Sequence, residues 1–120
     1  MNILIVDDNK QFRSAFRYII EENFADKFEE LYEAENGAEC IEIIREKTVD
    51  IVFMDKQMPV MDGVEATKKI VDNYRNIRII AVSFHSEFED IKGMLEAGAR
   101  NYIIKEEITP KAIANCMKIS

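Results

Sequence analysis

Side chains that could do chemistry come directly after four apolar stretches of the sequence. They are Asp7, Asp8, Asp55, Ser83 and Lys105. If the apolar stretches are strands of one parallel sheet, these groups meet at its carboxyl edge, where open α/β sheets bind their ligands. Three carboxylates, a hydroxyl and an amine gathered there predict a small site for a divalent cation and a phosphoryl group.

The three aspartates predict the cation. Two like charges about 5 Å apart repel by roughly 3 kcal/mol at an effective dielectric constant near 20. Asp7, Asp8 and Asp55 would therefore need a cation among them if the strands at 2–6 and 50–54 are neighbours. Mg²⁺ suits oxygen-only ligands and needs only one or two carboxylates. No histidine or cysteine occurs at these positions, which argues against zinc. Taken without Asp55, the Asp7-Asp8 pair would suit a helix amino terminus equally well.

Ser83 and Lys105 supply the complementary half of the predicted site. A hydroxyl and an ammonium that face a carboxylate–cation cluster can hold phosphoryl oxygens by hydrogen bonding and by charge. Either residue alone at a strand end would be read as structural. Only their joint placement with the aspartates indicates phosphoryl chemistry.

Hydrophobic periodicity alternates between buried strands and amphipathic helices, which predicts five strand–helix units. The expected strands are at about 2–6, 28–34, 50–54, 77–82 and 100–104. The expected helices are at about 10–22, 37–47, 64–74, 87–97 and 109–119. Right-handed crossovers between parallel strands place helices on both faces of a doubly wound α/β sheet. The strand at 28–34 is the most polar and suits an edge.

The same periodicity predicts which helix positions face the core. The residues expected to point inward from the helices at 10–22, 64–74 and 87–97 are Phe12, Ala15, Phe16, Ile19, Ile20, Val64, Thr67, Ile70, Val71, Tyr74, Phe88, Ile91 and Leu95. Cys40 and Cys116 lack metal-ligand spacing, so we expect both to be buried thiols in a reducing compartment.

Composition limits the classes of protein to consider. A chain of 120 residues with 48% hydrophobic residues predicts one folded domain over residues 1–120, with no effector domain inside it. The net charge of −7 argues against direct nucleic-acid binding. No apolar run approaches the roughly 20 residues of a membrane span, and nothing resembles a signal peptide. We therefore expect a cytoplasmic protein without a membrane anchor.

The motifs resemble the receiver domain of bacterial two-component response regulators. The matching segments are Asp7-Asp8, residues 33–39, residues 55–63, Ser83 and residues 98–105. Their spacings are intact through essentially the whole chain. The resemblance implies a flavodoxin-like parallel sheet of five strands in the order 2-1-3-4-5, with five helices on its two faces.

The resemblance also implies an acceptor and a metal site. Asp55 would take a phosphoryl group from a sensor histidine kinase, a phosphotransfer protein or a small phosphodonor. Asp8 and Asp55 would bind Mg²⁺ through their side chains, Gln57 through its backbone carbonyl and Asp7 through a water, with Mn²⁺ able to replace Mg²⁺. Such a domain catalyses only its own phosphorylation and dephosphorylation, not the turnover of a separate substrate.

A switch and its partners follow from the same resemblance. Ser83 and Lys105 would hold the phosphoryl oxygens, and Tyr102 would turn inward as Ser83 moves toward the phosphate. The output face would comprise the helix at about 87–97 and the strand and helix that follow it. Its partner would be a downstream protein or an effector domain outside this chain, and phosphorylation could be linked to dimer formation.

Four residues depart from the family pattern or add to it. Phe84 stands where a small residue is usual, which predicts narrower access and slower phosphorylation and hydrolysis. Glu106 replaces the usual proline after Lys105, and a cis bond without proline costs roughly 2.5–4 kcal/mol, so we expect a trans bond. Lys56, where an apolar residue is usual, either faces solvent, which is favoured, or stabilises the phosphorylated state. His85 is either a surface-loop residue, again favoured, or a group that tunes dephosphorylation.

Two other functions stay open. One is a phosphate-independent interaction module, which Phe84 favours and the intact set of site residues disfavours. The other is a Mg²⁺-dependent phosphohydrolase of the haloacid dehalogenase class. That class has an Asp-x-Asp pattern on its first strand, whereas here Asp7 and Asp8 are adjacent and Asn9 follows.

Overall fold

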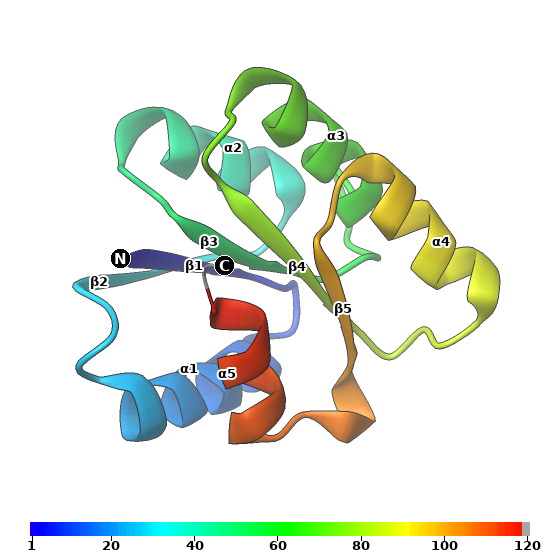
Figure 1. Ribbon diagram of the computed structural model, residues 1–120. Coiled ribbons are helices and arrows are strands. Elements are labelled where there is room, and N and C mark those ends of the chain that lie inside the picture. Colours follow the sequence, from blue (N-terminus) through cyan, green and yellow to red (C-terminus); the bar gives the residue numbers. More distant parts are fainter. Residues whose placement is uncertain (119–120) are drawn as a thin grey trace.

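A five-stranded parallel sheet forms the middle layer of the fold (Figure 1). The computed structural model describes residues 1–118. Its strands are β1 (Asn2–Val6), β2 (Glu30–Ala34), β3 (Ile51–Met54), β4 (Arg78–Ser83) and β5 (Asn101–Ile104). They lie in the order β2-β1-β3-β4-β5, which confirms the predicted sheet and places the polar strand β2 at an edge.

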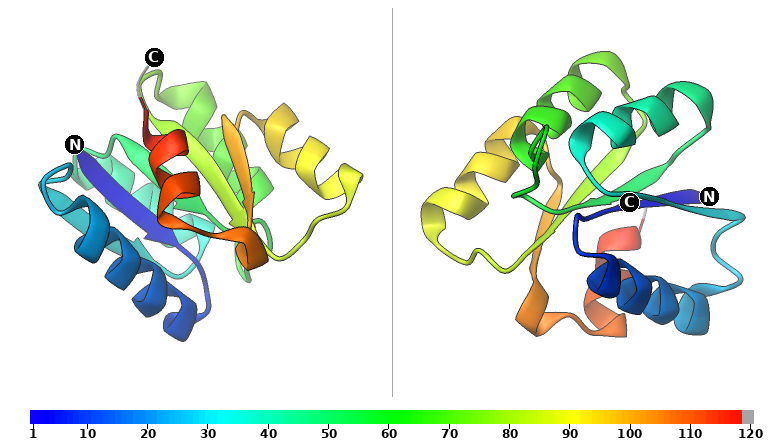
Figure 2. Two further views of the ribbon diagram at one scale, coloured as in Figure 1. Left: turned by 60° about the horizontal axis from the view of Figure 1, so that its bottom comes forward. Right: turned by 180° about the vertical axis from the view of Figure 1, so that it is seen from behind.

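Helices cover both faces of the sheet, as the crossover rule requires. They are α1 (Lys10–Phe24), α2 (Gly37–Glu46), α3 (Gly63–Asn73), α4 (Phe88–Ala97) and α5 (Pro110–Met117). Helices α1 and α5 lie on one face, and α2, α3 and α4 lie on the other (Figures 1 and 2). The last helix was predicted to reach 119, a position outside the described residues. Within residues 1–118, no helix combines the length and apolar character that crossing a membrane would need.

Side-chain caps fix where four of the helices begin. The capping residues are Asn9, Asn36, Asp62 and Thr109, and the side chain of each accepts a hydrogen bond from the backbone N–H three residues later. Asn9 stops the loop after β1 at three residues, so the two aspartates of that loop stay at the strand end. Local sequence thus determines the geometry of the loop that carries two of the three carboxylates.

Apolar side chains form one buried cluster on each face of the sheet. Both cysteines are buried, as predicted. The predicted inward faces of the helices are partly wrong, because the inward stripe of α4 is Met94 and Ala97. At 3.6 residues per turn that stripe lies roughly 120° around the helix from the one predicted. The residues expected inside but found exposed are Ala15, Val71, Phe88 and Leu95.

Candidate functional site

The carboxyl edge of the sheet gathers the predicted site residues. The Asp55 N–H donates to the Val6 carbonyl at 2.9 Å, which holds the aspartate at the end of β3 beside the end of β1. Asp7, Asp55 and Ser83 are buried, and the Lys105 side chain is 5% exposed. The strand order therefore brings together groups that lie as far as 98 residues apart in the chain.

Lys105 bridges two of the carboxylates. Its Nζ lies 2.6 Å from Asp7 Oδ2 and 3.6 Å from Asp55 Oδ2. Asp7 Oδ1 accepts the Asn9 N–H at 2.8 Å, so both oxygens of Asp7 are engaged. The ammonium is held chiefly by Asp7 and is within reach of any group that adds to Asp55.

The three aspartates form a compact cluster of oxygen donors. One carboxylate oxygen from each of Asp7, Asp8 and Asp55 lies within 4.8 Å of the others. Asp8 is exposed, whereas the other two are buried, so the cluster opens to solvent on one side. Carboxylate and water oxygens suit Mg²⁺ rather than a softer cation. Gln57 is exposed in the loop after β3, two residues beyond Asp55.

Asp55 is the group whose ionisation the site perturbs most clearly. The pKa of Asp55 is raised to about 6, chiefly by burial and then by the negative charge of Asp7. The positive charge of Lys105 lowers this pKa, but by less than Asp7 raises it. Ionising this carboxyl without a cation is therefore costly. A divalent ion among the aspartates would favour the charged, nucleophilic form.

Ser83 and Tyr102 contact the same stretch of backbone. Ser83 Oγ is buried and accepts the His85 N–H at 3.2 Å. The Tyr102 hydroxyl donates to the His85 carbonyl at 2.6 Å, and burial raises the pKa of this tyrosine. The His85 residue itself is exposed on the loop after β4. A shift of Ser83 would move the carbonyl to which Tyr102 is bonded.

Two aromatic rings enclose the lysine ammonium. Lys105 Nζ lies 4.1 Å from the ring centroid of Phe12 and 4.9 Å from that of Phe84. Contacts of this kind stabilise a desolvated cation by about 2 kcal/mol. Phe84 is 60% exposed, so its ring lies between the ammonium and solvent. The sequence suggested a core position for Phe12 but gave no signal that its ring contacts Lys105.

The favoured interpretation placed Lys56 in solvent, but the structure shows it half-buried in an ion pair. Its Nζ lies 3.1 Å from Asp90 Oδ1, and the two side chains are 24% and 23% exposed. The pair joins the residue after Asp55 to the first turn of α4, because α4 packs beside α3 on that face. The Lys105–Glu106 bond is trans, as predicted, with Glu106 in a short 3-10 turn (Lys105–Glu107).

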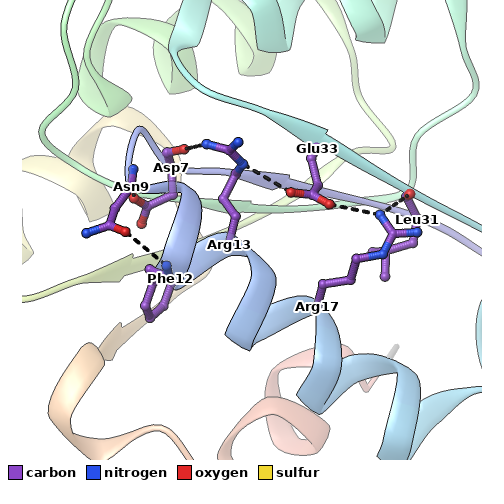
Figure 3. A network of polar contacts seen from close by, with 7 residues as sticks. All are labelled: Asp7, Asn9, Phe12, Arg13, Arg17, Leu31 and Glu33. Atoms are coloured by element: carbon purple, nitrogen blue, oxygen red, sulfur yellow. Dashed lines mark hydrogen bonds and ion pairs between the residues drawn. The ribbon is translucent and has the colours of Figure 1, made fainter.

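A network of two arginines and a glutamate holds the backbone of Asp7 (Figure 3). Arg13 Nη1 donates to the Asp7 carbonyl at 2.7 Å, and Arg13 Nε donates to Glu33 Oε1 at 3.1 Å. Arg17 Nη1 donates to the other Glu33 oxygen at 3.0 Å. The network ties α1 to the edge strand β2. Sequence reasoning missed it, and the acidic residue within a predicted strand was the one signal that could have found it.

Nearly the whole chain matches a known family. The family described as "Response regulator receiver domain" matches residues 3–117. The chemotaxis protein CheY of Halobacterium salinarum is 40% identical over 103 residues, which cover 86% of this chain and 82% of that protein. The transcriptional regulatory protein DegU of Brevibacillus brevis is 29% identical over 106 residues, covering 88% of this chain but 44% of DegU. The chain thus spans less than half of that regulator.

Solved structures show the same architecture. The CheX–CheY–BeF3–Mg²⁺ complex of Borrelia burgdorferi contains a chain that superposes with a TM-score of 0.82 at 27% identity, covering 97% of this chain and 85% of that one. A CheY-like receiver domain protein of Methanospirillum hungatei gives a TM-score of 0.82 at 25% identity, covering 95% and 87%. Both similarities cover nearly the whole length of this chain.

Proposed function

This chain belongs to the response regulator receiver domain family, and from that premise we propose that it accepts a phosphoryl group on Asp55 in a Mg²⁺-dependent reaction. The observation that carries the proposal is the position of Asp55. Its buried carboxyl lies in a cluster of three aspartates and 3.6 Å from the Lys105 ammonium. The donor would be a sensor histidine kinase, a phosphotransfer protein or a small phosphodonor.

The metal would be held by the aspartate cluster. We assign side-chain ligation to Asp8 and Asp55, a backbone carbonyl to Gln57 and a water-mediated contact to Asp7, because the three carboxylates already converge. Bound there, Mg²⁺ supplies positive charge that offsets the charge of the transferred group. Mn²⁺ has the same preference for oxygen ligands and would substitute.

Phosphoryl transfer would then proceed on Asp55. A carboxylate oxygen of Asp55 forms the bond to phosphorus while the phosphorus–nitrogen bond of the donor's phosphohistidine breaks, and the imidazole nitrogen keeps the electron pair. Lys105 Nζ, now within 3.6 Å of Asp55, would pair with an oxygen of the new acyl phosphate. The buried Ser83 hydroxyl would donate to another oxygen.

The switch would follow from the bonds of the β4–α4 loop. When Ser83 Oγ turns to the phosphate, it gives up the His85 N–H. Tyr102, bonded to the His85 carbonyl, would then change position, and the face formed by α4, β5 and α5 would change with it. Phosphorylation biases a two-state equilibrium, so a minor active population should exist beforehand.

The wider assignment follows the family. We infer that the output is passed to a separate target protein or to an effector domain, as the coverage of less than half of DegU allows. A phosphorylation-linked dimer and a cytoplasmic location remain predictions. A phosphate-independent module is not favoured, because every charged and hydroxyl group of the predicted site lies at the same sheet edge.

Intact mass after incubation with acetyl phosphate and Mg²⁺ tests the proposal. We expect one phosphoryl adduct on the wild-type chain and none without metal or in Asp55→Asn. Asp26→Asn, a change at an exposed aspartate, is the matched control and should label normally. Because the Phe84 ring lies over the Lys105 ammonium, phosphoramidate serves as a smaller second donor. No adduct with either donor, or an adduct in Asp55→Asn, would refute the assignment.

A further inference from the structure

A hollow lies at the amino edge of the sheet, opposite the edge that holds Asp55. It has a volume of about 370 Å³ and is lined mainly by the turn before β4, the turn before β5 and the start of β3. In a parallel sheet the amino ends of all strands share one edge, so these turns lie together although they are far apart in sequence (Figure 1). The hollow is therefore separate from the proposed phosphoryl site.

The hollow is basic in a protein whose net charge is −7. Arg75, Arg78 and Arg100 line it, which is half of the six arginines in the chain. Asp50 is the acidic residue among those lining it. Among the side chains that line the hollow, three guanidinium charges against one carboxylate leave a surplus of two positive charges.

The guanidinium groups have few partners. Among residues 1–118, none of the three arginines forms an ion pair with a carboxylate. Arg78 Nη1 donates to the Cys116 carbonyl at 3.3 Å, which uses one of its five N–H donors. Asp50 Oδ2 instead accepts the Asn2 N–H at 2.7 Å.

The backbone beneath two of the arginines is fixed by the sheet. The Arg78 N–H donates to the Asp50 carbonyl at 2.9 Å, and the Arg100 N–H donates to the Ile79 carbonyl at 2.8 Å. Arg75 lies in the turn between α3 and β4 and is exposed. A ligand would thus meet two anchored arginines and one that can adjust to it.

We propose that this hollow binds a compact oligophosphate anion, such as a triphosphate chain. The planar guanidinium group matches phosphate oxygens in a two-pronged geometry. An oligophosphate concentrates several negative charges in a small volume. It therefore matches both the surplus of positive charge and the size of the hollow, about 370 Å³. An extended polyanion such as DNA would also meet the acidic remainder of the surface, which disfavours it.

A titration of the full chain with inorganic triphosphate tests this proposal. The titration is monitored by amide NMR chemical shifts at low ionic strength. EDTA is present, so that no metal site contributes. We expect saturable shifts at residues 75–78 and 100, and the same affinity in Asp55→Asn. In the double variant Arg75→Gln/Arg100→Gln the affinity should fall by at least about tenfold, because two charged partners are lost. Arg78 is left intact because it also contacts α5.

Arg45→Gln is the matched control, since it removes one exposed arginine outside the hollow. Its affinity for triphosphate should stay within about twofold of wild type. Shifts confined to the amides near Asp55 and Lys105, or equal loss of affinity in Arg45→Gln and the double variant, would overturn the proposal. Tighter binding of short duplex DNA than of triphosphate would overturn the ligand class. Neither result bears on phosphorylation of Asp55, which the mass measurement tests separately.

Discussion

Replacing Asp55 by asparagine should stabilise the protein in a pH-dependent way. The native fold raises the pKa of this carboxyl from 3.8 to about 6, first by burial and then through the charge of Asp7. The native state therefore holds a proton on Asp55 more tightly than the unfolded chain does. Asparagine is similar in shape and carries no charge, so the variant escapes the cost of ionisation.

The sign and size follow from linkage. Below pH 3.8 Asp55 is protonated in both states and costs nothing. As pH rises through 3.8 and then 6, the unfolded state ionises first and the native state loses relative stability. A change from 3.8 to about 6 corresponds to about 3 kcal/mol, at 1.36 kcal/mol per pH unit. Asp55→Asn should gain up to this amount over wild type between acid and neutral pH.

Urea unfolding of both proteins from about pH 4 to 7.5, with EDTA present, measures the difference. Titrating groups that are not coupled to Asp55 cancel when the two stabilities are subtracted at each pH. Asp26→Asn, at an exposed aspartate, should show no such trend. Added Mg²⁺ should stabilise wild type selectively, because it favours the ionised aspartate cluster. The difference in unfolding free energy between Asp55→Asn and wild type should therefore become smaller.

A stability difference between Asp55→Asn and wild type that does not change with pH would refute the reasoning. It would mean that Asp55 ionises in the native state as easily as in the unfolded chain. Failure of Mg²⁺ to narrow the gap would separately contradict the use of this carboxylate as a metal ligand.

Three further experiments test features of the fold around the site. A double-mutant cycle with Lys56→Gln and Asp90→Asn should give a coupling of about 1 kcal/mol in urea unfolding, since the ion pair is partly screened by solvent; a value near zero would contradict the proposed link to α4. Gly63→Ala should destabilise by more than about 2 kcal/mol. Its Cβ would clash with the backbone carbonyl oxygen of Asp55, whereas Gly93→Ala meets nothing within 4 Å. As the control, Gly93→Ala should gain about 0.5–1 kcal/mol in mid-helix, and equal losses at both positions would be inconsistent with this packing. Val60 has a φ of 68° and is 83% exposed, so Val60→Asn should raise the thermal midpoint by relieving about 1 kcal/mol of strain; an unchanged midpoint would argue that no strain is stored there.

Much of the architecture could be predicted from the sequence because it rests on local patterns. Strand and helix positions followed from hydrophobic periods, and the caps at Asn9 and Asp62 begin their helices where the pattern changes. The gathering of the site residues also follows locally. Each stands directly after a strand, and parallel strands share a carboxyl edge.

Side-chain partners were harder to predict. The rotation of α4 decides that Met94 is buried and Phe88 exposed, and periodicity alone placed that face wrongly. The partner of Lys56 is Asp90, 34 positions away in the chain, so no local pattern indicates it. The packing of α4 against the neighbouring helix sets both features, and its apolar residues allow more than one rotation.

The sequence by itself determined the order of elements and the residues at the strand ends, and therefore which charged and hydroxyl groups meet at the carboxyl edge. Only the tertiary structure decided that the rings of Phe12 and Phe84 enclose the Lys105 ammonium. It also decided that Arg13 donates to the backbone carbonyl of Asp7, and that three arginines line one hollow at the opposite edge. The physical reason is the separation along the chain over which each effect acts. Periodicity and capping act within a few residues, whereas these contacts depend on strand register and on how each helix is rotated against the sheet.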